Sequence, residues 1–179
     1  ITNLGTLPGG GYSAARGVND LAQVVGYARA ADGQEHAFLW QNGVMTDLGT
    51  FGGSSSAAYR INKHGQIVGR YVDGIGHGYV WHNGNLRVLN SSDLFDINDA
   101  GQAVGVKNSR AIIWNPDGSI TDVGLLPGYP SSFAFDINTH GEVVGFGWND
   151  TEHRAFYWQN GVMQDLGTLG GTMSEARGI

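Results

Sequence analysis

The chain of 179 residues has no cysteine, few charged residues (15%) and no long apolar run. Without cysteine there is no disulfide framework, so the cellular compartment cannot be read from bridges. Because no stretch of about 18 apolar residues occurs, we expect no membrane insertion. The 16 acidic residues outnumber the 10 Lys and Arg, which gives a net charge of −6 without any basic run. That balance argues against nucleic acid and anionic membrane surfaces as partners.

Glycine is the residue in excess, with 30 of the 179 positions, far above the usual share of roughly 7%. The glycines follow no Gly-X-Y period, which excludes a collagen helix. An aromatic content of 11% and the low charge content argue against disorder. Glycines beside aromatic and β-branched residues are typical of short strands joined by tight turns, so we expect an all-β protein.

Three short markers recur in the same order, about 40 residues apart, and divide the chain into four repeats. The markers are an aliphatic residue before Asn (Val18-Asn19, Ile61-Asn62, Ile97-Asn98, Ile137-Asn138), a Val-Gly pair (Val25-Gly26, Val68-Gly69, Val104-Gly105, Val144-Gly145) and a tryptophan (Trp40, Trp81, Trp114, Trp158). We predict repeats at approximately 13–50, 56–89, 93–124 and 133–168, within a single repeat domain 1–179.

Turn signals divide each repeat into four short strands. The pair Asn42-Gly43 predicts a hairpin, because a type I′ turn needs a positive φ at both central residues. The other repeats carry Asn83-Gly84, Asp117-Gly118 and Asn160-Gly161 at this place. The third strand contains the run Ala37–Trp40, which is apolar on both faces. Since radial stacking of blades covers both faces of a sheet, we predict a β-propeller built of four-stranded antiparallel blades.

Between repeats we expect the chain to cross the face of a blade. The segment 49–55 suits this path, because its glycines permit turns and Phe51 can wedge between blades. The same place in the other crossings is taken by Leu7, Leu126 and Leu169.

Two further features concern the ends and the third repeat. The third repeat should be the trimmed blade, because its central hairpin at 107–109 is short. Residues 1–6 and 173–179 are left over as partial strands, an extra half-blade beyond four complete repeats. We interpret the chain as part of a longer array, with a second interpretation in which four blades share these strands with neighbouring chains.

Residues His36–Thr50 read HAFLWQNGVMTDLGT and resemble the repeat of the HAF-repeat family of extracellular bacterial proteins, which is named for its His-Ala-Phe. The motifs Asp-Leu-Gly-Thr-Leu-Gly-Gly and Ile-Asn-x-x-Gly-Gln-Val-Val-Gly are equally typical, so the resemblance covers essentially the whole chain. The later repeats depart from it with His77-Gly78-Tyr79, Arg110-Ala111-Ile112 and Arg154-Ala155-Phe156. The resemblance implies secretion and a β-propeller-like repeat architecture, but no reaction.

A cationic side chain stands a few residues before the tryptophan of each repeat. These residues are His36, His77, Arg110 and Arg154. Equivalent positions form a ring around a propeller, so one hypothesis is a ring that holds an anionic ligand such as an acidic sugar. The alternative is that each side chain caps the start of its strand and stacks on a nearby aromatic ring.

Metal and cofactor sites are not indicated. His64 and His140 lie in equivalent turns, and neither has a second ligand at metal spacing. The Asn-Asp pairs at 19–20, 98–99 and 149–150 are typical of turns closed by side-chain oxygens. We therefore predict no metal and no cofactor.

Catalytic residues are not indicated either. Asp47, Asp122 and Asp165 recur at one repeat position, where we expect them to bond the backbone at the crossing. The non-repeated carboxylates form no recognisable pair of the kind that glycoside hydrolysis needs. They are Glu35, Asp93, Asp96 and Glu175. We predict no catalytic residue and no enzyme.

We expect a secreted, non-catalytic repeat module for interaction or structural assembly, with a glycan, a cell surface or a protein as its partner. Loop aromatics support this hypothesis because they can stack on sugar rings, although core packing is their other explanation. They are Tyr12, Tyr59, Tyr129 and Trp148. One alternative is a polysaccharide-acting hydrolase or lyase with loop-borne catalytic residues. Another is an extracellular structural protein that self-assembles through its terminal strands.

Overall fold

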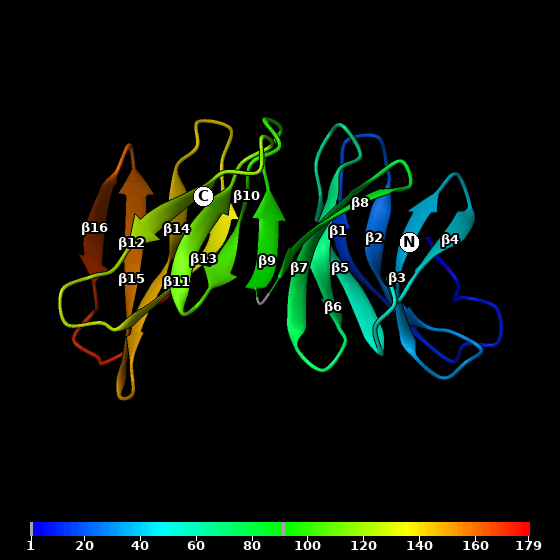
Figure 1. The fold of residues 1–179 in the computed structure, drawn as a ribbon, viewed down its shortest axis with the longest axis horizontal. Helices are drawn as coiled ribbons and strands as arrows, with labels where there is room; N and C mark the ends of the chain where they lie inside the picture. The colour runs from blue at the N-terminus through cyan, green and yellow to red at the C-terminus, as the bar shows by residue number, and fades with distance from the viewer. Residues whose placement is uncertain (1, 91) are drawn as a thin grey trace. The chain divides into compact units, whose positions relative to one another are not determined.

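The computed structural model describes residues 2–90 and 92–179, and all regular elements in them are β-strands (Figure 1). The first sheet consists of β1 (Ser13–Val18), β2 (Val24–Arg29), β3 (Glu35–Gln41) and β4 (Val44–Gly49). The second consists of β5 (Ser55–Ile61), β6 (Ile67–Val72), β7 (Gly76–His82) and β8 (Asn85–Asn90). The third consists of β9 (Ser92–Ile97), β10 (Ala103–Lys107), β11 (Arg110–Trp114) and β12 (Ile120–Gly124). The fourth consists of β13 (Ser131–Ile137), β14 (Val143–Asn149), β15 (Glu152–Gln159) and β16 (Val162–Gly167).

Each sheet is an antiparallel meander whose strands are neighbours in chain order. These sheets confirm the all-β class and the four four-stranded repeats, and we name them blade 1 to blade 4. Closure of the blades into a propeller ring stays a prediction. Within the described part of the chain, no helix is long and apolar enough to cross a membrane.

The chain divides into two compact units, Ile1–Asp93 and Leu94–Ile179, and the division falls inside β9. In the first unit, one face of blade 1 packs on blade 2 through a shared core of Val25, Ala37, Ala58, Ile61, Ile67 and Tyr79. In the second unit, the equivalent faces of blades 3 and 4 share a core that includes Val104, Ile113, Ala134, Ile137 and Phe156. Blade-on-blade packing is therefore the source of the core in both units.

The hairpin turns follow their sequence signals in three blades. Asn42 has φ 52° and Gly43 has φ 84°, and the pairs Asn83-Gly84 and Asn160-Gly161 are likewise positive at both positions. Blade 3 differs from the prediction, because in its turn Gly118 alone has a positive φ and its N–H donates to the carbonyl of Asn115. The proline at position 116 fixes a negative φ, which selects a type I turn and excludes type I′.

Blade 3 is the trimmed blade, as predicted. Its strands β10, β11 and β12 have 5 residues each. A tight turn at Asn108 and Ser109, with φ values of 50° and 62°, joins β10 to β11. The pair Lys107 and Arg110 closes this hairpin.

The crossing segments place a large apolar side chain against the blades at three of the four predicted positions. Leu7 and Leu126 are buried. Phe51 packs on the core of the first unit, with its ring centroid 4.7 Å from that of Tyr79. The prediction is wrong for Leu169, which is fully exposed. No core cluster includes its side chain among the described residues.

A repeated serine joins β5 to blade 1, β13 to blade 3 and the C-terminal segment to blade 4. Ser56 accepts a hydrogen bond from the Ala37 N–H at 2.7 Å and donates one to the Gly49 carbonyl at 2.6 Å. The same pair of bonds joins Ser132 to Ala111 and Gly124, and Ser174 to Ala155 and Gly167. The hydroxyl thus satisfies two backbone groups that the bulged ladder between third and fourth strands leaves open.

The two predicted partial strands do not form as strands. Residues 2–6 are irregular, and residues 173–179 contribute only an isolated bridge between Met173 and His153. Ser174 and Ala176 nevertheless donate their N–H groups to the carbonyls of His153 and Gly145. Since β14 and β15 already have neighbours on both sides, the segment finds no free edge along which a ladder could extend.

Candidate functional site

The four residues predicted to form a ring lie at the starts of the third strands, and each is paired with an acidic side chain of its own blade. His36 Nδ1 lies 2.9 Å from Asp47, and its Nε2 lies 3.1 Å from Asp32. Arg110 Nε lies 2.7 Å from Asp122. Burial opposes protonation of His36, but its hydrogen bonds to the two aspartates outweigh it and raise the pKa of the imidazole.

The other two residues have acidic partners as well. Arg154 lies 3.8 Å from Asp165. In blade 2 valine occupies the position of the repeated aspartate, and His77 instead lies 2.7 Å from Asp73 and stacks on Tyr71 with centroids 4.9 Å apart. These contacts favour the alternative in which each cation anchors its own strand. The ligand-binding ring stays a prediction.

The repeated aspartates bond the backbone at the crossings, as predicted. Asp47 accepts the N–H of Gly49 at 2.7 Å, and Asp122 and Asp165 accept from Gly124 and Gly167 in the same way. These glycines have positive φ values between 74° and 101°. One carboxylate therefore holds both the strand-start cation and the turn into the crossing segment.

The structure brings together a carboxylate pair that the sequence prediction missed. Asp96 is 8% exposed and accepts the Ile137 N–H at 3.0 Å, while Asp136 accepts the Ile179 N–H at 2.7 Å. Burial, and then a hydrogen bond to Asp136, raise the pKa of Asp96 to about 7. Glycosidase carboxylates stand at least about 5 Å apart around the scissile bond, so this hydrogen-bonded pair is an element of blade packing.

Of the four aromatics predicted on loops, Tyr59 lies in β5 and Trp148 in β14, so the loop prediction is wrong for these two. Tyr129 is buried in the core of the second unit, and its hydroxyl donates to Glu152 at 2.9 Å. Tyr59 is partly buried, and burial raises its pKa. Tyr12, which bonds Glu35, and Trp148 remain exposed. Core packing thus explains Tyr129.

Blade 4 departs from the repeat at two positions that contact each other. Four residues after the marker asparagine, the first three repeats have glutamine (Gln23, Gln66, Gln102), whereas blade 4 has Glu142. At the position before the tryptophan, the first three repeats have Leu39, Val80 and Ile113, whereas blade 4 has Tyr157. The Tyr157 hydroxyl donates to Glu142 Oε1 at 2.6 Å. Because repeated residues perform the shared structural tasks, this joint departure marks a candidate site specific to blade 4.

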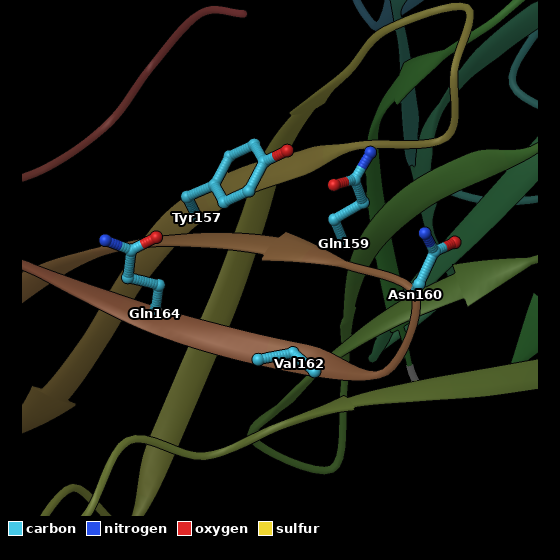
Figure 2. Close-up of a pocket in the computed structure, with 5 residues that line it drawn as sticks. All are labelled: Tyr157, Gln159, Asn160, Val162 and Gln164. Carbon is cyan, nitrogen blue, oxygen red and sulfur yellow. The ribbon is translucent and has the colours of Figure 1, made fainter.

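Tyr157 lies at a hollow on the hairpin of β15 and β16 (Figure 2). The hollow has a volume of about 370 Å³ and is lined by Tyr157, Gln159, Asn160, Val162 and Gln164. Tyr157 is paired across the strands with Gln164, and Gln159 with Val162. Since side chains alternate along a strand, these four lie on one face of the hairpin. We name this feature the blade-4 hollow.

Glu142 lies beside the blade-4 hollow and fixes two of its lining side chains. Its Oε1 accepts from the Tyr157 hydroxyl and from Gln159 Nε2, the latter at 2.9 Å, and its Oε2 accepts from Asn138 Nδ2. The bonds from Tyr157 and Asn138 lower the pKa of Glu142, and the bond to Glu142 raises the pKa of Tyr157. At neutral pH the carboxylate is therefore ionised and the phenol keeps its proton.

The comparisons with known proteins and the search for metal clusters are both negative. No family model and no curated protein matches the chain. Among residues 2–90 and 92–179, no group of three or more His, Asp and Glu side chains is arranged to hold a metal ion. The candidate site is therefore defined by the blade-4 hollow and its internal comparison with the other repeats.

Proposed function

We propose that this protein is a secreted, non-catalytic repeat module that binds a glycan through the blade-4 hollow. The observation that carries the proposal is the contact between Glu142 and Tyr157 at the two positions where blade 4 departs from the repeat. The resemblance to the HAF-repeat family supports an extracellular location, where glycans are abundant partners.

The lining of the blade-4 hollow suits a sugar ring. A pyranose has an apolar C–H face and a rim of hydroxyls, and the Tyr157 ring offers a flat apolar surface with a polar edge. The side chains of Gln159, Asn160 and Gln164 offer amide donors and acceptors for the hydroxyls. A volume of about 370 Å³ falls in the range of about 300–1,000 Å³ that is usual for small-molecule sites.

The same lining argues for binding without turnover. Its side chains are one phenol, three amides and one valine, whereas glycoside hydrolysis needs two carboxyl groups that flank one bond. Glu142 lies nearby, but its oxygens already accept three hydrogen bonds from side chains of its own blade. A nucleophile or general acid must instead reach the substrate.

The test is retention of the protein on insoluble cellulose, xylan, mannan, galactan and chitin. Tyr157→Leu installs the residue that blade 1 has at this position, so we expect the variant to fold. Truncating an aromatic anchor costs about 1–2 kcal/mol of binding, which corresponds to about 5- to 30-fold weaker retention. The matched control is Tyr12→Leu, which removes an exposed tyrosine that does not line the blade-4 hollow and should leave retention unchanged.

The proposal fails if the wild-type protein is retained by none of these polysaccharides. It also fails if Tyr157→Leu is retained as well as the wild type, or if release of soluble sugar accompanies retention. Circular dichroism of each variant excludes misfolding as the cause of a loss.

A further inference from the structure

In blade 4 the hydrogen bond between the turn residue and the residue after the tryptophan runs in the opposite direction to that in blades 1 and 3. In blade 1, Gln23 Nε2 donates to the side-chain oxygen of Gln41, the residue after the tryptophan, at 3.1 Å. In blade 3, Gln102 Nε2 donates to the side-chain oxygen of Asn115 at 3.2 Å. In blade 4 the direction is reversed, because Gln159 Nε2 is the donor to Glu142.

The reversal follows from the chemistry of the residue in the turn. A glutamine has an amide N–H to donate, whereas an ionised carboxylate can only accept hydrogen bonds. With Glu142 in place, the neighbouring amide of Gln159 must therefore turn its nitrogen toward the carboxylate. Figure 2 shows the oxygen of Gln159 on the side of Tyr157 in this view. The Tyr157 hydroxyl is constrained in the same way, since its only proton is donated to Glu142.

We propose that Glu142 makes the part of the blade-4 hollow formed by Tyr157 and Gln159 rich in acceptors and negative in charge, so that the hollow binds sugars through their hydroxyl or ammonium donors and disfavours sugars that carry a carboxylate. Glu142 accepts the only hydroxyl proton of Tyr157 and one of the two Nε2 hydrogens of Gln159, so the oxygens of both side chains keep lone pairs for a ligand. The ligand class is thus a neutral or amine-bearing glycan. This inference rests on the proposed function, and it assigns Glu142 as a positioning residue that acts through Gln159 and Tyr157.

Charge supports the same selectivity. Glu142 adds a negative charge within hydrogen-bond distance of two lining side chains, and no lining side chain is cationic. The net charge of −6 also disfavours the approach of a polyanion. The carboxylate of a uronate would therefore face hydrogen-bond acceptors and would also be repelled by the charge of Glu142. This repulsion disfavours the wrong ligand and so contributes to specificity.

The experiment compares polymers that share a backbone and differ in charge. We would use affinity electrophoresis in gels that contain polygalacturonate or its methyl ester, carboxymethyl cellulose or hydroxyethyl cellulose, and chitosan. The wild-type protein should bind the neutral member of a pair about tenfold more tightly than its carboxylated partner. Glu142→Gln should fold, because three blades carry glutamine at this position. It should bring that ratio close to one, because Gln159 is then free to present its N–H groups to the ligand.

The control Asp20→Asn changes the net charge by the same amount in an exposed turn and should leave the ratio unchanged. Equal binding of neutral and carboxylated polymers by the wild type overturns the inference, as does an unchanged ratio in Glu142→Gln. Either result leaves the proposed function standing if Tyr157→Leu still loses retention. Failure of the wild-type protein to bind any polymer, soluble or insoluble, removes the proposed function and this inference with it.

Discussion

Replacing Asp96 by asparagine is expected to stabilise the protein at pH 8 and to leave its stability at pH 4 unchanged. Asp96 is buried, shares a hydrogen bond with Asp136 and accepts the Ile137 N–H. Protonated Asp96 can donate to Asp136 while its other oxygen accepts from the backbone. Asparagine has the same shape, with an N–H₂ donor and a carbonyl acceptor, so Asp96→Asn preserves both bonds without a proton that depends on pH.

The magnitude follows from the two pKa values. The pKa of Asp96 is raised from 3.8 to about 7 in the folded protein, so the folded state holds this proton more tightly than the unfolded state. The stability from that proton is fully present below about pH 4 and is lost as the pH rises to about 7. The difference between the two pKa values corresponds to about 4 kcal/mol. We expect Asp96→Asn to exceed the wild type by about 2–4 kcal/mol at pH 8.

The assay is urea unfolding at pH 4, 6 and 8, followed by tryptophan fluorescence. The free-energy difference between Asp96→Asn and the wild type should grow with pH across this window. Asp20→Asn, in an exposed turn, controls for the change in net charge and should track the wild type. A variant that is less stable than the wild type at pH 8, or a difference that is independent of pH, would refute the carboxylate-pair argument.

Two further predictions concern blade packing. Ser132→Ala should lower the free energy of unfolding by about 1–3 kcal/mol in urea titrations, because the Ala111 N–H loses its buried partner; an unchanged midpoint would contradict the serine fastening. Leu126→Ala should cost about 2–5 kcal/mol, whereas Leu169→Ala, at the same place in its own crossing but exposed, should stay within about 0.5 kcal/mol. Equal costs for the two leucines, measured by thermal unfolding, would refute this distinction.

Features that depend on nearby residues could be predicted from the sequence. The Asn42-Gly43 hairpin is set by the φ preferences of two adjacent residues, and the short hairpin of blade 3 follows from the spacing of its strands. The aspartate that caps each crossing was predictable because it recurs, as Asp47 and Asp165 illustrate. A residue that has the same structural role in every repeat recurs at a regular spacing in the sequence.

Features that depend on contacts between blades could not be predicted in the same way. Asp96 and Asp136 meet because β9 and β13 lie in adjacent blades, although about 40 residues separate them along the chain. Their shared Asp-Ile pair before the marker asparagine was the available signal. Leu169 has the sequence environment of Leu126, yet only Leu126 is buried. Burial depends on whether other side chains pack against the leucine, as the core of the second unit does for Leu126.

The blade-4 hollow shows that positions where one repeat differs from the others can indicate a site. Aligning the repeats on the marker asparagine places Glu142 against three glutamines, and this signal was present in the sequence. Its meaning needed the structure, because Tyr157 and Gln159 come from β15, beyond the intervening strand β14. A carboxylate in place of an amide changes no fold requirement, since Asn138 and Gln159 are bonded in either case. It changes which group donates and which accepts. This change has little effect on blade stability, but it alters the donors and acceptors that a ligand meets.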